Sequence, residues 1–127
     1  MTLKIGVDIV EVPRVQAILD RHQARFLERV FTAQEAADCC GRATSLAARW
    51  AAKEAVSKAL GCGWDGIQWT EIEIVRTPQG QPIVSLHGAA LTLAEQLGLR
   101  NWAISLSHTA AYAVAFVVAQ SNAEGQG

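Results

Sequence analysis

Apolar and polar residues alternate near the start of the chain. The apolar positions of this stretch are Leu3, Ile5, Val7 and Ile9. A period of two is typical of a half-buried strand, so we predict a strand over residues 3–9. Pro13 ends the alternation and suits the first turn of a helix, which we expect to reach about His22 or beyond.

Two more helices are predicted in the next thirty residues. Thr32 with Glu35 three residues later is the pattern of a capping box, and it begins a short helix that Gly41 ends. The alanine-rich segment Leu46–Leu60 follows, and Gly61 supplies its stop signal. We expect this segment to be the long central helix of the fold.

The pattern after residue 67 predicts a second group of elements. Two apolar runs separated by turn residues predict a strand pair, an amphipathic stretch predicts a helix, and two final apolar runs predict another strand pair. These segments are Gln68–Arg76 with Pro82–Leu86, then His87–Leu97, then Trp102–Ser107 with Tyr112–Gln120. Helices inserted between strands in this way indicate an α+β fold with an antiparallel-rich sheet.

Length and composition limit the fold to one domain. Of the 127 residues, 50% are apolar and 18% are charged, which is enough for one hydrophobic core and excludes a disordered protein. We expect a domain over residues 1–120 and a frayed polar tail over residues 121–127. The three cysteines form no C-x-x-C pair, so they indicate neither a zinc ribbon nor a disulfide framework. Cys39 and Cys40 are interpreted as buried thiols, which fits a reducing cytoplasm.

Charge and the length of the apolar runs exclude two classes of partner. Eleven Lys and Arg against twelve Asp and Glu give a net charge of −1, whereas general nucleic-acid binders usually have a basic excess. The longest apolar run, residues 110–119, is shorter than the roughly 20 residues that span a bilayer. No secretory apolar stretch stands at the N-terminus. We therefore expect a cytoplasmic protein that binds neither nucleic acid nor a membrane.

Asp8 is unusual among the apolar residues of the first strand. Aspartate is depleted in strands, and a buried carboxylate without a partner is costly. Asp8 is therefore either a functional carboxylate with a partner elsewhere, or an edge residue that caps the next element.

The central helix carries two kinds of charge pair. Trp50, Glu54 and Lys58 share one face, and Glu54 with Lys58 forms a favourable pair at i,i+4. Arg49 and Lys53 have the same spacing but like charges, which is mildly destabilising. Such a pair is understood most easily if an anion lies between the two side chains. The alternative is two solvated side chains that point apart.

The first helix has a basic stripe. Arg14, Arg21 and Arg25 lie close together at helical spacing, and residues 12–30 carry a local charge of +2. Such a stripe indicates either an acidic partner surface or an ordinary solvated helix face.

Ser107 and His108 do not form a serine-hydrolase pair. Adjacent strand residues point to opposite faces, and no G-x-S-x-G elbow surrounds the serine. Together with Thr109 they either bind an anion or make turn hydrogen bonds. Glu71 and Glu73, which alternate along a predicted strand, are expected to face water.

Three segments resemble the signatures of the holo-[acyl-carrier-protein] synthases, the small 4′-phosphopantetheinyl transferases. Residues 5–11 (IGVDIVE) resemble the N-terminal signature, and residues 48–61 (ARWAAKEAVSKALG) look like the second, W-x-x-K-E-A with a lysine four residues on. Residues 105–109 (SLSHT) resemble the third, and Phe31-Thr32 stands where the family has F-[ST]. The resemblance covers about residues 3–119 in matching order and spacing.

The resemblance implies an activity and a catalytic group. The family transfers the phosphopantetheine arm of coenzyme A to a serine of an apo acyl carrier protein, releases adenosine 3′,5′-bisphosphate and serves fatty acid biosynthesis. By this resemblance, Asp8 and Glu54 are ligands of a Mg²⁺ ion, for which carboxylate and phosphate oxygens are suitable. Lys58, one turn after Glu54, is then placed to reach the same phosphates.

The resemblance also implies the remaining binding residues. Arg49, Lys53, Gly61, His108 and Thr109 are expected to contact coenzyme A together with Lys58. The basic stripe of Arg14, Arg21 and Arg25 corresponds to the family helix that docks the acidic helix of the carrier protein.

The resemblance also bears on the oligomeric state, and it leaves the identity of the general base open. The small synthases resemble one another in being homotrimers with sites between subunits. The apolar alternation of residues 112–119 provides surface for burial either inside the chain or between chains. The base that deprotonates the carrier serine is open among Glu35, Asp38, a metal-bound water and a substrate phosphate.

Two other functions compete with the transferase. One is a catalytically silent module that only docks a carrier protein, and the other is a metal-independent regulator that binds coenzyme A. A docking module needs only the basic stripe, so the joint presence of Asp8, Glu54 and Lys58 argues against it. A metal-independent regulator makes Asp8 unnecessary.

Overall fold

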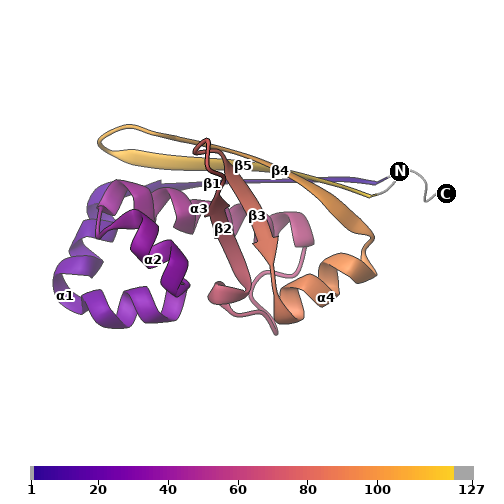
Figure 1. Cartoon of the computed structure of the whole chain (residues 1–127), viewed down its shortest axis with the longest axis horizontal. Coiled ribbons are helices and arrows are strands. Elements are labelled where there is room, and N and C mark those ends of the chain that lie inside the picture. Colours follow the sequence, from indigo (N-terminus) through magenta and orange to yellow (C-terminus); the bar gives the residue numbers. More distant parts are fainter. Residues whose placement is uncertain (1, 122–127) are drawn as a thin grey trace.

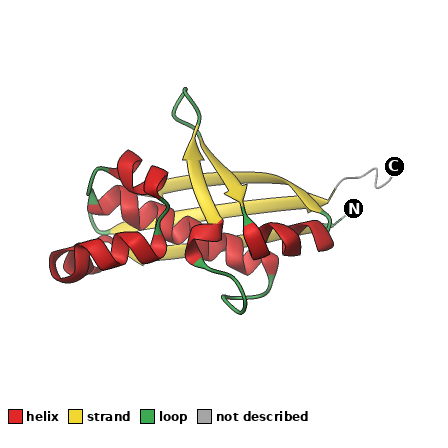
Figure 2. Cartoon of the chain, turned by 60° about the horizontal axis from the view of Figure 1, so that its bottom comes forward, coloured by secondary structure: helices red, strands yellow, loops and turns green. Residues whose placement is uncertain are grey.

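The α+β fold expected from the sequence is confirmed by a computed structural model that describes residues 2–121. A three-stranded antiparallel sheet and a separate two-stranded hairpin pack around a central helix, as Figures 1 and 2 show. The elements are β1 (Leu3–Glu11), α1 (Val12–Val30), α2 (Ala33–Cys39), α3 (Ala43–Leu60), the short 3-10 helix η1 (Trp69–Glu71), β2 (Ile72–Arg76), β3 (Pro82–Leu86), α4 (Gly88–Gln96), β4 (Leu99–His108) and β5 (Tyr112–Ser121). Of the expected tail, Ser121 ends β5 and residues 122–127 lie outside the described residues.

The larger sheet has the order β1-β5-β4, so β5 is its central strand. The register places Asp8 opposite Ala115 and His108 opposite Ala113. The pairing of the last two strands was predicted and is confirmed, although β4 begins at Leu99, three residues earlier than expected. The two edge strands, β1 and β4, are therefore separated by the full width of β5.

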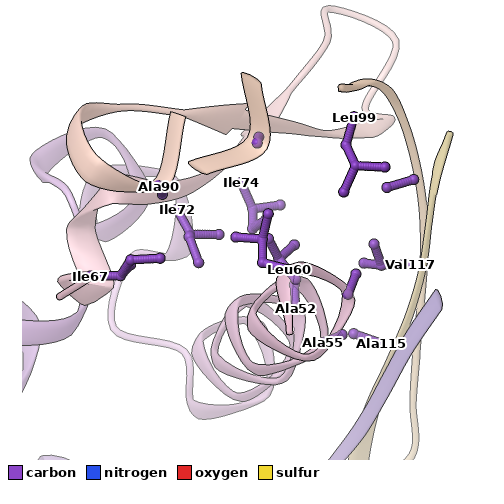
Figure 3. Packing of buried hydrophobic residues seen from close by; sticks show 14 of the residues in the cluster. Ala52, Ala55, Leu60, Ile67, Ile72, Ile74, Ala90, Leu99, Ala115 and Val117 are labelled. Carbon is purple, nitrogen blue, oxygen red and sulfur yellow. The ribbon is translucent and has the colours of Figure 1, made fainter. Parts of the chain in front are cut away.

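Helix α3 packs across one face of this sheet. Figure 3 shows its alanines against β5 on one side and against the isoleucines of β2 on the other. At Gly6 the backbone of β1 lies so close to α3 that an added Cβ atom would overlap the carbonyl oxygen of Ala55. Only glycine permits this approach, which holds the next inward residue of β1, Asp8, beside the helix.

The apolar side chains of β1 lie on the other face of the sheet. Leu3, Ile5, Val7 and Ile9 are between 52% and 61% exposed. On β5 the division is similar, because Tyr112 and Phe116 are exposed, whereas the alternate positions 113, 115, 117 and 119 are buried. The face that meets α3 is filled by small residues, and the large apolar residues of β1 form an uncovered surface.

Helix α1 continues beyond His22, as the sequence allowed, and is kinked there. It runs to Val30, and His22 interrupts it with φ −141° and ψ 39°. Helix α2 begins with the predicted capping box of Thr32 and Glu35. It ends at Cys39, and its C-cap Cys40 adopts the left-handed conformation with φ 50°, one residue before the expected Gly41.

The expected strand over residues 68–76 is only partly correct. Its first half is the 3-10 helix η1, and the strand begins at Ile72. The Glu71 carboxylate accepts a hydrogen bond from the backbone N–H of Gln68 at 3.0 Å. This local capping bond favours a helical turn over an extended strand.

Candidate functional site

Asp8 and Lys58 form an open ion pair between β1 and α3. The Lys58 ammonium lies 3.2 Å from Asp8 Oδ1 and donates a second hydrogen bond to the carbonyl oxygen of Val7 at 2.9 Å. The Lys58 side chain is 54% exposed and that of Asp8 is 21% exposed. Both groups therefore keep access to solvent and to a ligand. The partner that the sequence required for Asp8 is this lysine.

Glu54 lies one helical turn before Lys58, on the same side of α3. Its carboxylate is partly buried, and its Oε1 accepts a hydrogen bond of 3.1 Å from the indole N–H of Trp64. Trp64 belongs to the loop after α3 and was not selected from the sequence. The available signal was a large aromatic residue in the glycine-rich segment CGWDG.

The chemistry of these donors fits Mg²⁺ shared with a phosphate. Mg²⁺ is usually bound by one or two protein carboxylates together with water and substrate phosphate oxygens. Asp8 and Glu54 can supply two such carboxylates. Within residues 2–121 no group of three or more His, Cys, Asp or Glu side chains gathers. These residues thus suit a substrate-bridged ion rather than a metal enclosed by protein ligands.

Lys53 does not have the position that we expected beside Arg49. Its side chain is fully buried, and its ammonium donates hydrogen bonds to Glu35 Oε1 at 2.7 Å and to the carbonyl oxygens of Trp69 and Ile72. Burial lowers the pKa of Lys53, and the Glu35 carboxylate partly offsets this effect. All three N–H groups are used inside the core. Lys53 and Arg49 therefore do not hold an anion between them, and Lys53 has no N–H group left to contact coenzyme A.

Glu35 is likewise excluded as the base that accepts the serine proton. It is fully buried, with Oε1 accepting from Lys53 and from the backbone N–H of Thr32, and Oε2 accepting from the N–H of Ile74. No oxygen of Glu35 is free to meet a substrate. Asp38 keeps an accessible carboxylate, because its side chain is 27% exposed.

Arg49 lies at the edge of a cavity of about 410 Å³ under β4. Its guanidinium donates to the carbonyl oxygen of Glu35 at 3.2 Å, which anchors it to α2. Arg76 and His108 also line the cavity, whereas none of its described lining residues is Asp or Glu. Arg49 is also paired with Asp38 at 3.7 Å, outside the lining. The lining itself is electropositive and suited to a phosphate group. Arg76 was missed because its strand pattern gave no sign of the hairpin turning toward β4.

Thr109 and Gly61 have local structural roles. The hydroxyl oxygen of Thr109 accepts hydrogen bonds from the N–H groups of Ala111 and Tyr112, at 3.2 and 3.1 Å, in the turn between β4 and β5. Gly61 ends α3 in the left-handed conformation with φ 77°, as the sequence predicted. Neither residue lines the electropositive cavity.

The basic stripe of α1 is divided by the kink at His22. Arg14 and Arg21 line one shallow cavity of about 320 Å³, and Arg25 lines another of the same size. Ile18 and His22 line both. The surface therefore combines guanidinium groups with apolar depressions, which a straight solvated helix would not provide.

Glu71 and Glu73 do not simply face water, contrary to our expectation. Glu71 also accepts a hydrogen bond from the N–H of Ala89 at 3.2 Å. Glu73 accepts one from the Thr32 hydroxyl at 2.6 Å and lies 3.0 Å from His87 Nε2, with 15% of its side chain exposed. Burial acts to raise the pKa of Glu73, but the hydrogen bonds from Thr32 and His87 outweigh it and lower that pKa.

The three cysteines are free thiols. Cys39 is buried, as expected, and burial raises its pKa, although neighbouring Arg49 acts in the opposite direction. Cys40 is exposed, contrary to our expectation of a buried pair. None of the helices within residues 2–121 is both long and apolar enough to cross a bilayer.

Comparison with known sequences gives consistent matches over nearly the whole chain. A model of the 4′-phosphopantetheinyl transferase superfamily matches residues 4–117. A holo-[acyl-carrier-protein] synthase of Gloeobacter violaceus is 47% identical over 118 residues, which cover 90% of this chain and 89% of that protein. The synthase of Herpetosiphon aurantiacus is 48% identical over 123 residues, covering 91% of this chain and 97% of that protein.

Solved structures show the same similarity. Helicobacter pylori holo-[acyl-carrier-protein] synthase in complex with coenzyme A has a TM-score of 0.83 at 32% identity, covering 91% of this chain and 99% of that chain. The Chronobacterium ammoniagenes synthase–coenzyme A complex has a TM-score of 0.84 at 31% identity, covering 96% and 99%.

Proposed function

This chain belongs to the 4′-phosphopantetheinyl transferase superfamily, and we propose that it is a holo-[acyl-carrier-protein] synthase whose single transferase domain spans residues 1–120. It transfers the 4′-phosphopantetheine group of coenzyme A to a serine of apo acyl carrier protein. The observation that carries this proposal is the Asp8–Lys58 pair, because it joins a carboxylate to an accessible ammonium one helical turn from a second carboxylate, Glu54. Similarity to synthases over more than 90% of the chain supports the same reaction.

The reaction is a phosphoryl transfer with a simple balance of bonds. The serine oxygen forms a bond to the phosphorus that carries the pantetheine arm. The bond from that phosphorus to the bridging oxygen of the pyrophosphate breaks, and adenosine 3′,5′-bisphosphate leaves with the electron pair. The serine proton passes to a base, for which Asp38, a water molecule and a substrate phosphate are the candidates.

Asp8 and Glu54 would hold Mg²⁺ in this proposal. When bound there, the ion would supply positive charge to the pyrophosphate of coenzyme A. Lys58 contributes a positive charge at the same phosphates, and its exposed ammonium can exchange Asp8 for a phosphate oxygen. The Val7 carbonyl keeps the lysine oriented during that exchange.

The electropositive cavity under β4 is the proposed binding place for the nucleotide end of coenzyme A. Arg49 and His108 supply contacts to its phosphates, and Arg76 joins them. Gly61 and Thr109 remain in the proposal as backbone and turn positions beside the coenzyme. Their local hydrogen bonds hold the ends of α3 and β4 in place.

We further propose that the protein is a homotrimer with shared sites. The four apolar side chains of β1, with Tyr112 and Phe116 of β5, form an uncovered apolar sheet face, and such faces mark association surfaces. Asp8 stands on β1, whereas the cavity is lined by residues of β4, the opposite edge strand of the sheet. A site assembled from two chains would bring a carboxylate cluster from one to the cavity of the next.

The carrier protein is proposed to dock on α1. Arg14, Arg21 and Arg25 attract an acidic helix, and the depressions around Ile18 accept its apolar side chains. We also propose a cytoplasmic location, supported by the three free thiols.

One assay tests the transferase activity. The protein is incubated with coenzyme A, Mg²⁺ and an apo acyl carrier protein, and the carrier is weighed by mass spectrometry. We expect the mass of one phosphopantetheine group to be added in Mg²⁺ and not in excess chelator. An unmodified carrier in the presence of an assembled protein and a competent carrier would refute the enzyme and favour a docking module. Modification that is insensitive to chelator would refute the metal role alone.

A further inference from the structure

Trp64 contacts Glu54, one of the two metal ligands of the proposed function. Its indole N–H donates to Glu54 Oε1 at 3.1 Å. Trp64 lies in the loop that follows Gly61, ten residues after Glu54 and outside the three signatures that identified the site. The contact is therefore not part of what those signatures explain.

The ring of Trp64 is held by the core. It stacks on Trp69, with 3.8 Å between ring centroids and an interplanar angle of 35°. The carbonyl oxygen of Trp69 accepts a hydrogen bond from buried Lys53 at 3.1 Å, and its ring meets Trp50 edge-on at 6.1 Å. The donor that reaches Glu54 is thus part of an aromatic stack that packs against the core.

We propose that Trp64 is a positioning residue that orients Glu54 for Mg²⁺, an inference that rests on the proposed function. Its N–H occupies Oε1 and leaves Oε2 for the ion. An indole is uncharged, so it restrains the carboxylate and leaves its negative charge in place. A lysine in the same position would neutralise that charge. Hydrogen-bond partners of this kind fix ligand orientation, and their loss typically lowers metal affinity or activity about 10- to 100-fold.

Two measurements test this role. In the wild-type protein with coenzyme A present and no carrier, the indole N–H resonance of Trp64 should shift as Mg²⁺ is added, because the charge of its acceptor is redistributed. The Trp102 indole donates to the carbonyl oxygen of Leu99 and serves as the internal control, with no shift expected. This measurement needs no variant and so does not depend on the folding of one.

The second measurement uses Trp64→Phe, which keeps a ring on Trp69 and removes the donor. We expect the Mg²⁺ concentration for half-maximal transfer to rise roughly tenfold, while kcat at saturating Mg²⁺ stays within about twofold of wild type. The matched control is Trp102→Phe, with unchanged Mg²⁺ dependence.

The outcomes separate the inference from the function on which it rests. An unshifted Trp64 resonance while the wild type responds to Mg²⁺, or a wild-type Mg²⁺ dependence in folded Trp64→Phe, overturns the positioning role and leaves the transferase standing. If the wild type transfers the arm without any Mg²⁺ dependence, both the metal site and the role of Trp64 are overturned. If it transfers nothing, the function itself fails.

Discussion

Two carboxylate–lysine pairs join α3 to its neighbours, and they differ in almost every physical respect. Glu35 and Lys53 are both fully buried, 2.7 Å apart, with every N–H of the lysine used. Asp8 and Lys58 are 3.2 Å apart, with side chains 21% and 54% exposed. The first pair connects α2, α3 and β2 and has no capacity left for a ligand. The second retains that capacity, so the same two functional groups serve structure at Lys53 and are open to chemistry at Lys58, further along the same helix.

The largest effect should come from the open pair and its neighbour. Asp8→Ala and Glu54→Ala should each lower transfer at least about a thousandfold, or roughly 4 kcal/mol, because each removes one of the two proposed metal ligands. The free energy of unfolding should change by less than about 1 kcal/mol, since the side chains are only partly buried. Mass spectrometry of the carrier and urea denaturation measure the two quantities. Near-normal turnover of either variant would show that the ligands are elsewhere.

The buried pair of Glu35 and Lys53, the closed pair, should affect stability rather than transfer. Lys53→Met should lower the free energy of unfolding by about 3–5 kcal/mol, because it leaves the Glu35 charge buried without its partner. The matched control is Lys58→Met on the same helix, for which we expect less than about 1 kcal/mol. Equal losses of stability in the two variants, measured by urea denaturation, would mean that burial does not distinguish the pairs.

Loss of assembly should lower the transfer activity that depends on Asp8 and Lys58, and it should leave the buried pair of Glu35 and Lys53 intact. Ile5→Glu places a charge on the uncovered apolar sheet face and should convert the proposed trimer to smaller species, with a loss of transfer but a folded core. Light scattering gives the mass, and far-ultraviolet circular dichroism checks the fold. Lys4→Glu, one residue earlier on β1, is the control for charge alone. A wild-type protein that is monomeric while it transfers the arm would contradict the shared site.

A smaller effect is expected from the basic stripe of α1, the proposed docking surface for the carrier protein. Arg14→Glu with Arg21→Glu should raise the KM for the carrier roughly tenfold and flatten its dependence on salt, because rim charges act mainly on association. The kcat should change little. Arg100→Glu on β4 is the control, since it reverses a charge away from α1. An unchanged KM for the carrier would exclude this docking face.

The smallest effect concerns Glu73, which supports the closed pair through Thr32. Its pKa in the folded protein is lower than the usual value of 4.5, so the charged form contributes stability above that value, and the contribution is lost as the pH falls through the folded pKa. Glu73→Gln should therefore cost a few tenths of a kcal/mol to about 1 kcal/mol near neutral pH. The difference from wild type should shrink below about pH 4.5. A difference that grows toward acid would reverse the assigned direction.

Local signals predicted most elements correctly. The capping box of Thr32 and Glu35, the stop at Gly61 and the alternation along β1 each involve neighbours in the chain, and the structure contains all three. The expected strand over residues 68–76 failed where the Glu71 carboxylate forms a local cap. The kink at His22 was also not predicted, because the hydrophobic periodicity of the sequence does not reveal it.

The members of the candidate site were easier to select than to place. Asp8, Glu54 and Lys58 stood out from the sequence, and the structure brings Asp8 to Lys58 across fifty positions. Lys53 was given the wrong surroundings, because helical spacing puts it beside Arg49 but cannot show that β2 and α2 enclose its ammonium. Trp64 was missed, since its contact with Glu54 depends on how the loop folds back over α3.

By itself, the sequence determined the candidates for chemistry Asp8, Glu54 and Lys58, the start of α2 and the end of α3, and which family the chain resembles. These properties depend on residue type and on spacing along the backbone. Only the tertiary structure decided which charged groups are open to a ligand and which are consumed in the core. It also decided that β1 turns Gly6 and Asp8 toward α3 and leaves its isoleucines uncovered. The reason is that solvent exposure and hydrogen-bond partners are set by segments distant in sequence.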